Sequence, residues 1–342
     1  MSWLRRDPRA THRLSRILVL AAAAGLASAC GGDTPTAPTG PQIQPFLIQC
    51  PADVLGQSTT GAPVSLQVPP ATTTGGVLPV TVSCSPAGTP FPVGTTRVAC
   101  SASDARSAAA SCRFNVNVAP PPLSRTTFLA FGDSMTEGEI TVPASTGTGA
   151  IGADGFPNFR LIVVPSESYP TKLLALLRNR YFTQALQFIV TNAGKSGEWA
   201  SDGAKRLPSV LAATRPQVVL LLSGANDLEA QPSAVGVNNA LGGLQSMVRT
   251  ARAAGTIVFI ATLPPGRAGG RLSLPPGIVQ AVNDSIRAGA PIEGATLVDL
   301  NAAMAPNVTT LIGIDGLHPT EAGYQRMAET FFMAIRTAFE GR

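Results

Sequence analysis

The sequence predicts an α/β fold with a central parallel sheet for residues 124–342, and a small all-β sandwich for residues 46–118. Two observations predict the α/β part. Its apolar strands are continuous rather than alternating, which is typical of strands buried on both faces, and helical stretches separate them, as in parallel sheets. The all-β part is predicted by short strands and turns that follow one another at close spacing.

Five apolar runs of the α/β part are predicted to form strands, with helices between them. Along the chain we expect strands at TTFLAFGD (126–133), QFIVTNA (187–193), QVVLLLSG (217–224), TIVFIATL (256–263) and TLVDL (296–300), and helices at YPTKLLALLRNR (169–180) and around 204–214, 233–253, 278–287 and 320–339. Ligands of such sheets bind at the carboxyl ends of the strands. The turns GDS, NAGKSG and GAND all fall there.

The all-β part contains five stretches that read as strands. They are FLIQC (46–50), PVSLQV (63–68), LPVTVSC (78–84), GTTRVAC (94–100) and CRFNVNV (112–118), which together suggest a small antiparallel sandwich. The proline-rich APPPL (119–123) then reads as a stiff linker.

Four cysteines fall within this predicted sandwich: Cys50, Cys84, Cys100 and Cys112. An even number in a small exported domain suggests two disulfides, and four cysteines permit three pairings. Of these we favour Cys84–Cys100 with Cys50–Cys112.

The positive charge of the chain is concentrated near its start. The formal charge is +5, but residues 1–29 hold five arginines against one aspartate, and removing them leaves a balance of +1. With no basic patch and no zinc-finger or RNA-binding motif, the sequence gives no support for nucleic-acid binding.

Residues 1–29 read as a secretion signal. After the arginine-rich start, the apolar run Ile17–Ala27 is shorter than the ~20 residues that a membrane-spanning helix needs, and small residues precede Cys30. ASAC resembles a bacterial lipoprotein processing site, except that Ala27 stands where such sites usually have leucine. We therefore expect a lipidated Cys30 and a flexible tether over residues 30–45, which anchor an exported protein to the membrane of the cell envelope. The alternative is simple secretion after cleavage behind Ala29.

Ser134, in GDSMTEG (132–138), is the candidate nucleophile. A serine hydroxyl needs an adjacent base, and His12 lies in the signal, so a histidine base must be His318. Asp315, three residues earlier, is placed to accept a hydrogen bond from the imidazole and fix its tautomer.

Three hydrogen-bond donors at strand ends are candidates for an oxyanion hole. They are the backbone N–H groups of Ser134 and Gly197 and the side-chain amide of Asn226. Residues 124–342 hold one histidine and no cysteine, so we expect no catalytic zinc. A phosphate-binding P-loop is also absent, and we expect no cofactor.

The ordered set GDSMTEG, NAGKSG, GAND and DGLH resembles the SGNH/GDSL hydrolase superfamily from about Thr126 to Phe339. Met135 replaces the leucine that names the GDSL motif. The resemblance implies a flavodoxin-like three-layer α/β/α domain and a serine esterase or lipase. It also implies that Ser134, Asp315 and His318 are catalytic, and that the oxyanion donors belong to Ser134, Gly197 and Asn226.

The sandwich resembles the HYR (hyalin repeat) module. The matching features are Cys50-Pro51-Ala52-Asp53, then CSPAGTPFPVGTTRVACSASD and CRFNVNV. The resemblance implies an immunoglobulin-like domain with an adhesion or spacer role and a surface or carbohydrate partner.

Two functions follow as alternatives. The first is an exported serine esterase that acts on acetylated surface or extracellular carbohydrate, or on lipid esters. The loop over residues 139–168 is then expected to shape the substrate pocket, and FRLIVV (159–164) is the candidate for a lipase lid. The second is a surface adhesion protein in which the hydrolase fold is an inactive scaffold.

Overall fold

The computed structural model describes residues 44–88, 90–144 and 151–341. The predicted signal peptide, Cys30 and nearly all of the tether lie outside these ranges. Within the described residues, no helix has both the length and the apolar character needed to cross a bilayer.

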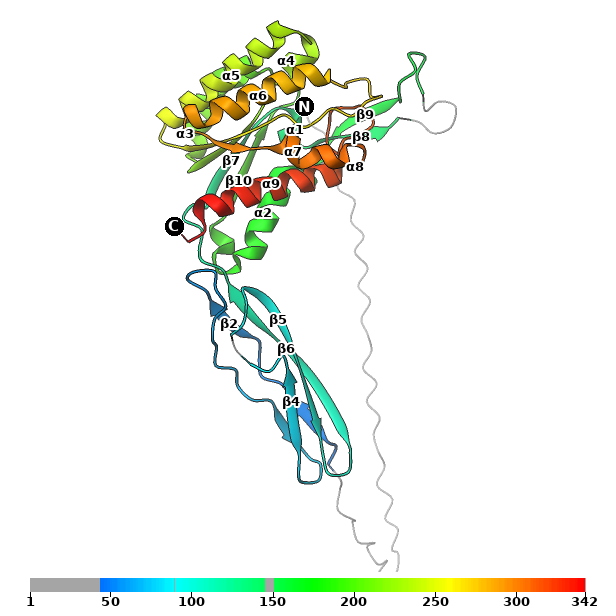
Figure 1. The fold of residues 1–342 in the computed structure, drawn as a ribbon, viewed down its shortest axis with the longest axis vertical. Helices are drawn as coiled ribbons and strands as arrows, with labels where there is room; N and C mark the ends of the chain where they lie inside the picture. Colours follow the sequence, from blue (N-terminus) through cyan, green and yellow to red (C-terminus); the bar gives the residue numbers. More distant parts are fainter. Residues whose placement is uncertain (1–43, 89, 145–150, 342) are drawn as a thin grey trace, which may run out of the picture. The chain divides into compact units, whose positions relative to one another are not determined.

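The C-terminal domain is built on a five-stranded parallel sheet with the strand order β10-β7-β11-β12-β13 (Figure 1). The strands are β7 (Thr127–Gly132), β10 (Ile189–Gly194), β11 (Val218–Leu222), β12 (Ile257–Ala261) and β13 (Thr296–Val298). Each corresponds to a predicted apolar run. Every residue of β11 is buried, as its continuous apolar sequence VVLLL requires of a strand covered on both faces.

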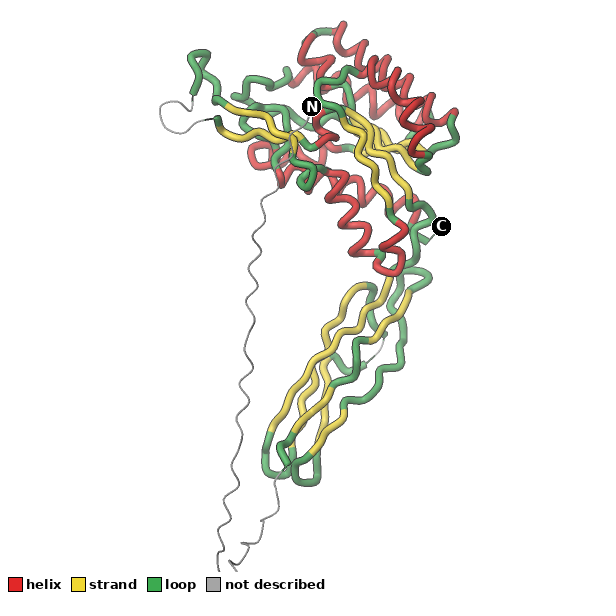
Figure 2. Tube along the Cα trace, turned by 180° about the vertical axis from the view of Figure 1, so that it is seen from behind, coloured by secondary structure: helices red, strands yellow, loops and turns green. Residues whose placement is uncertain are grey.

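Helices cover both faces of the sheet, which gives the predicted three-layer α/β/α architecture (Figures 1 and 2). α2 (Tyr169–Arg180) and α9 (Glu321–Phe339) pack together on one face, where the rings of Tyr169 and Phe331 stack 4.9 Å apart. On the other face lie α3 (Ala200–Thr214), α5 (Ala234–Ala253) and α6 (Pro276–Ile292). The fold class predicted for this domain is confirmed.

The strand order places a topological switch at β7, the first strand of this sheet along the chain. The chain leaves β7 for β10 on one side, then returns past β7 to β11 on the other. In doubly wound sheets the crevice at such a switch is where ligands bind. The residues that follow β7 therefore occupy the expected position of a site.

Short elements that were not predicted from the sequence connect the main strands and helices. They are α1 (Ser134–Glu137), β8 (Glu139–Pro143), β9 (Phe159–Val163), α4 (Ala225–Ala230), α7 (Leu300–Met304), α8 (Val308–Leu311) and the 3₁₀ turns Phe182–Gln187 and Ala305–Asn307. β8 and β9 form an antiparallel hairpin within the segment expected to be a loop. The stretch considered as a lipase lid is strand β9 of this hairpin.

The N-terminal module is a small β structure with two sheets, of order β1-β3 and β2-β6-β5-β4. Its strands are β1 (Leu47–Gln49), β2 (Val54–Gln57), β3 (Thr72–Thr74), β4 (Thr81–Ser85), β5 (Gly94–Ser103) and β6 (Ala109–Ala119). β6 ends one residue inside the segment predicted as a linker.

Two expectations for this module were wrong. PVSLQV is not a strand, and Val64 makes only an isolated bridge with Phe91. Pro63 and Pro69 bound the segment and lack the N–H donors that a ladder needs. The sandwich is also not purely antiparallel, because β2 pairs parallel with β6.

Both disulfides have the favoured pairing, Cys50–Cys112 and Cys84–Cys100. The sulfur atoms of Cys50, Cys100 and Cys112 lie close enough together to suggest a metal site, but all three cysteines are disulfide-bonded. No thiolate remains among them to bind a metal.

Candidate active site

Ser134 is the first residue of α1, directly beyond the carboxyl end of β7. Asp133 caps this short helix through a 3.1 Å hydrogen bond from the Met135 N–H to its Oδ1. Before it, Gly132 leaves no room for a side chain, because a Cβ there would lie 1.8 Å from the carbonyl oxygen of Leu222 on β11. The tight turn holds the Ser134 side chain at the sheet edge, 5% exposed.

Ser134, His318 and Asp315 form one continuous chain of hydrogen bonds. Ser134 Oγ lies 2.9 Å from His318 Nε2, and His318 Nδ1 lies 2.6 Å from Asp315 Oδ2. A carboxylate accepts the Nδ1–H, which leaves the Nε2 lone pair to accept the serine proton. The structure thus brings together the three side chains that the sequence predicted as nucleophile, base and acid.

The pKa of His318 lies above its ordinary value of 6.5. Burial of the ring lowers it, but the hydrogen bond and charge of Asp315, with smaller contributions from Glu139 and Asp133, outweigh the burial. The imidazole is therefore a stronger base than a free histidine.

The predicted oxyanion donors lie at the ends of adjacent strands. Gly132, at the end of β7, pairs with Gly194 of β10 on one side and with Leu222 of β11 on the other. Gly197 follows β10, and Asn226 lies in α4 just after β11. All three loops therefore emerge at one edge of the sheet.

Two of these donors are unoccupied within the described part of the chain. No described residue accepts a hydrogen bond from the backbone N–H of Ser134 or Gly197. Gly197 has φ +72°, a conformation that favours glycine, and a Cβ there would meet no atom within 4 Å. One hydrogen of the Asn226 amide goes to the carbonyl of Glu198 at 3.1 Å, which leaves the second free to bind an oxyanion.

The GAND turn is fixed to the start of α3 by Asp227. This buried carboxylate accepts a 2.9 Å hydrogen bond from the Ala200 N–H, and burial raises its pKa. Together with the Asn226–Glu198 bond, this contact ties α4 to the loop that carries Gly197.

An ion pair that the sequence analysis missed supports the same loop. Glu198 is buried and binds Arg206 of α3 through two hydrogen bonds of 2.6 and 2.5 Å. Arg206 also donates to the carbonyl of Ala193 at 3.0 Å and stacks 4.1 Å from the centre of the Phe131 ring. It thereby joins β10, β7 and the Gly197 loop. No motif predicts this contact; the signal that the sequence offers is a charged residue directly after the candidate Gly197.

A second missed residue is Glu139, at the start of β8. Its Oε2 lies 3.5 Å from His318 Nε2, on the nitrogen that also faces Ser134. The hydroxyl of Tyr324 on α9 donates to the Glu139 carbonyl at 2.6 Å and fixes this part of the hairpin. The signal available in the sequence was a carboxylate that directly follows GDSMTEG.

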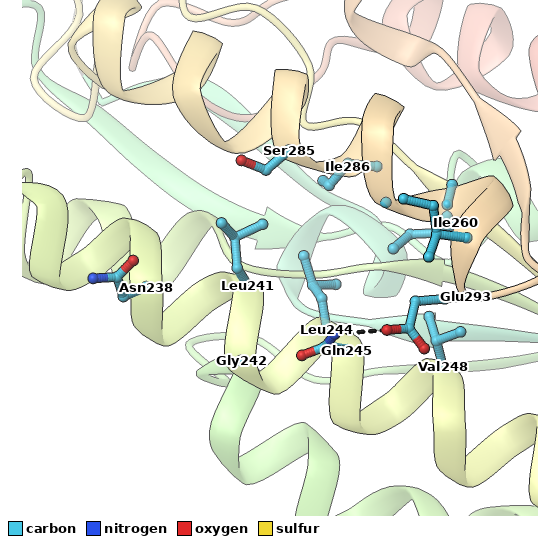
Figure 3. Close-up of a pocket in the computed structure, with 13 residues that line it drawn as sticks. Asn238, Leu241, Gly242, Leu244, Gln245, Val248, Ile260, Ser285, Ile286 and Glu293 are labelled. Atoms are coloured by element: carbon cyan, nitrogen blue, oxygen red, sulfur yellow. Dashed lines mark hydrogen bonds between the residues drawn. The ribbon is translucent and has the colours of Figure 1, made fainter.

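A mainly apolar cavity of about 480 Å³ lies between α5 and α6, apart from these residues (Figure 3). Leu241, Leu244 and Ile260 help to line it, and Gln245 is hydrogen-bonded to Glu293 at its edge. Its serine, Ser285, donates its hydroxyl proton to the carbonyl of Ala281 at 2.9 Å and makes no hydrogen bond to a histidine or carboxylate among the described residues. The arrangement suited to nucleophilic chemistry is the one at the sheet edge.

A family model described as GDSL-like Lipase/Acylhydrolase matches residues 130–326, more than half of the chain. The chain belongs to this family. It is a GDSL-type ester hydrolase, as the sequence predicted. A model of the HYR domain matches residues 42–118, so the resemblance seen for the N-terminal module is also confirmed.

Three known proteins illustrate what this chain is similar to. Esterase TesA of Pseudomonas aeruginosa is 30% identical over 166 residues, which cover 48% of this chain and 77% of that protein. A lipase/acylhydrolase structure from Enterococcus faecalis has 21% identity and a TM-score of 0.48, and covers 64% of this chain and 98% of its own. An acetylxylan esterase structure from Geobacillus stearothermophilus has 21% identity and a TM-score of 0.46, and the match covers 63% of this chain and 95% of that chain.

Proposed function

We propose that this GDSL hydrolase is an exported serine carboxylesterase that works through an acyl-enzyme on Ser134. The observation that carries the proposal is the hydrogen-bond chain from Ser134 Oγ through His318 to Asp315, with distances of 2.9 and 2.6 Å. These are the contacts that activate a serine at neutral pH.

The mechanism assigns one proton acceptor and three oxyanion donors. His318 Nε2 takes the hydroxyl proton as Ser134 Oγ bonds to the ester carbonyl carbon, and the backbone N–H groups of Ser134 and Gly197 and the amide of Asn226 bind the oxyanion. The bond to the leaving alcohol then breaks as Nε2 returns the proton to the alcohol oxygen. Water attacks the acyl-serine in the same way and releases the acid, which regenerates the serine.

For the substrate, we propose acetyl esters of surface or extracellular carbohydrate, with lipid esters as the second class. A tether and a HYR module suit an enzyme that acts on polymers outside the cell, with the module as an adhesion or spacer element that binds a surface or carbohydrate partner. The hairpin β8–β9 borders the site through Glu139 and is proposed to shape the pocket for the ester.

For localisation, we propose export with residues 1–29 as the signal peptide and lipidation at Cys30. The arginine-rich start, the short apolar run and the ASAC site support this proposal. The two disulfides of the N-terminal module agree with an oxidising compartment. A radiolabelled fatty acid fed to cells that express the chain is expected to label the wild type but not a Cys30→Ala variant. Equal labelling of both would overturn the anchor.

Turnover of esters by the purified mature chain tests the enzymatic proposal. Acetate esters of p-nitrophenol and of sugars, beside long-chain p-nitrophenyl esters, are expected to be hydrolysed by the wild type and not by Ser134→Ala. A higher kcat/KM for the acetates supports the carbohydrate proposal, and a higher value for the long-chain esters supports the lipid class. Absence of turnover with every ester would favour the adhesion protein with an inactive scaffold.

A further inference from the structure

We propose that Glu139 recognises a free hydroxyl group of the leaving alcohol, on the carbon adjacent to the one that bears the ester oxygen. The enzyme would then prefer partially acylated polyols, such as sugars or glycerol, over esters of simple alcohols. This inference rests on the proposed roles of Ser134 and His318 and deepens them.

The position of Glu139 follows from the path of the proton. The protonated His318 donates its Nε2 proton to the oxygen of the leaving alcohol. This leaving oxygen must therefore come within about 3 Å of Nε2. Glu139 Oε2 lies 3.5 Å from the same nitrogen. A hydroxyl on the carbon adjacent to the one that bears the leaving oxygen is therefore within hydrogen-bonding reach of the carboxylate.

Glu139 has acceptor capacity to spare. Ser196 Oγ lies 3.1 Å from Glu139 Oε2, but its single proton is closer to Glu137 Oε2, at 2.7 Å, which also accepts the Ser196 N–H at 2.7 Å. None of the described residues donates to Oε1 of Glu139. Its side chain is 15% exposed, so it is largely shielded from solvent but not sealed off from it.

The backbone holds this carboxylate in place. Glu139 is the first residue of β8 and pairs with Val163 of β9, and Tyr324 donates to its carbonyl. A group that is already positioned loses little conformational entropy when a ligand binds, which makes the contact selective.

The surrounding charges favour a neutral hydroxyl over an anionic group. The carboxyl groups of Asp315, Glu139 and Asp133 surround His318, and Glu137 shares Ser196 with Glu139. Of the described cations beside the Gly197 loop, Arg206 binds Glu198, and Lys195 lies 3.6 Å from the same carboxylate. An ester that carries a phosphate beside the scissile bond would be repelled.

Two matched esters test the proposal on the mature chain: 2-hydroxyethyl acetate and 2-methoxyethyl acetate. They share the acyl group and the spacing between the two oxygens of the alcohol, and differ in that a methyl group replaces the hydroxyl proton. The wild type is expected to favour the hydroxyl ester by roughly 10- to 100-fold in kcat/KM, the range typical of a hydrogen bond to a charged group. Equal rates for the two esters in the wild type would overturn the proposal without any variant.

Variants assign the preference to the side chain. Glu139→Ala is expected to abolish the preference, and Glu139→Gln, which keeps an uncharged acceptor, to reduce it to a fewfold. The control is Glu229→Gln, which replaces an exposed carboxylate on α4. It should keep the wild-type ratio of kcat/KM for the two esters. Rates are compared at the high-pH plateau, because Glu139 also raises the pKa of His318. A preference that persists in Glu139→Ala would contradict the proposal.

Further substrates show which kind of polyol carries the recognised hydroxyl. They also separate this inference from the proposed function. A monoacetylated methyl xyloside and glycerol monoacetate show whether a ring or an acyclic polyol fits better, and preference for either one supports the proposal. If p-nitrophenyl acetate is hydrolysed through Ser134 but neither polyol ester exceeds 2-methoxyethyl acetate, this inference fails and the esterase stands. If no ester is hydrolysed and Ser134 is not acylated, both fail.

Discussion

Asp315 holds His318 at two points. Its Oδ2 accepts the ring Nδ1–H at 2.6 Å, and its Oδ1 accepts the backbone N–H of the same residue at 3.2 Å. The carboxylate is fully buried and also accepts the Leu317 N–H. The turn that joins acid and base is thus closed by the acid itself, which sets both the tautomer and the direction of the imidazole.

Replacing Asp315 by asparagine should lower kcat by about 10³- to 10⁴-fold, because an amide can donate to Nδ1 and so favour the wrong imidazole tautomer. KM should change little. Steady-state kinetics on p-nitrophenyl acetate measure both constants, with Asp284→Asn on α6 as a matched surface control. A loss of less than tenfold would show that Asp315 does not orient the base.

Removing the Asn226 amide should act on the transition state. Asn226→Ala is expected to lower kcat by about 10²–10³-fold, with a much smaller rise in KM, because the oxyanion exists only after attack. Asn239→Ala, on the exposed face of α5, is the control. A change in KM alone would remove Asn226 from the oxyanion hole.

The Glu198–Arg206 ion pair should stabilise the fold as well as the Gly197 loop. Arg206→Met leaves Glu198, whose side chain is 2% exposed, without its main partner. The free energy of unfolding should fall by about 3 kcal/mol, at the low end of values for broken buried pairs, because Lys195 remains nearby. Urea unfolding measures this loss.

The double variant Glu198→Gln/Arg206→Met separates pairing from packing. The double variant should lose clearly less free energy of unfolding than the two single variants lose together, since no unpaired buried charge remains in it. Additive losses would mean that the two side chains do not stabilise each other. A lower kcat in folded Arg206→Met would show that the pair also positions the oxyanion site.

Asp133 should make stability fall as the pH rises. Burial, the largest influence, raises its pKa from 3.8 to about 7, so the folded state binds the proton more tightly than the unfolded state does. Its stabilising contribution is complete below pH 3.8 and is lost as the pH approaches 7, by up to roughly 4 kcal/mol at ~1.4 kcal/mol per pKa unit.

Asp133→Asn removes this ionisation while an asparagine still caps α1. Unfolding free energies measured in urea at pH 5 and pH 7.5 should therefore differ less for the variant than for the wild type. Equal pH dependence of the two proteins would show that Asp133 does not titrate in this range.

The core of the hydrolase domain could be predicted because its signals are local. The run Val218–Leu222 is apolar throughout and is buried throughout, and Ser134, Gly197 and Asn226 each lie shortly after a strand of the parallel sheet. His318 could be found by elimination, since no other histidine follows residue 29.

The rest depends on contacts between distant segments. Glu139 reaches His318 only because the β8–β9 hairpin and Tyr324 place it there, and Arg206 reaches Glu198 from the second turn of α3. Neither pair of residues stands at a sequence spacing that forms a recognisable motif. In the N-terminal module, PVSLQV has the alternation of a strand, but the prolines at its ends and the pairing of its neighbours decide its structure.

The most direct test of the account is the rate at which a fluorophosphonate phosphonylates the mature chain with loss of fluoride, followed by intact mass and peptide mapping. We predict one adduct, on Ser134, with no adduct in Ser134→Ala and a rate at least about 10³-fold lower in His318→Asn. An adduct on another serine, or an undiminished rate without the imidazole of His318, would contradict the assignment of Ser134 and His318 as nucleophile and base.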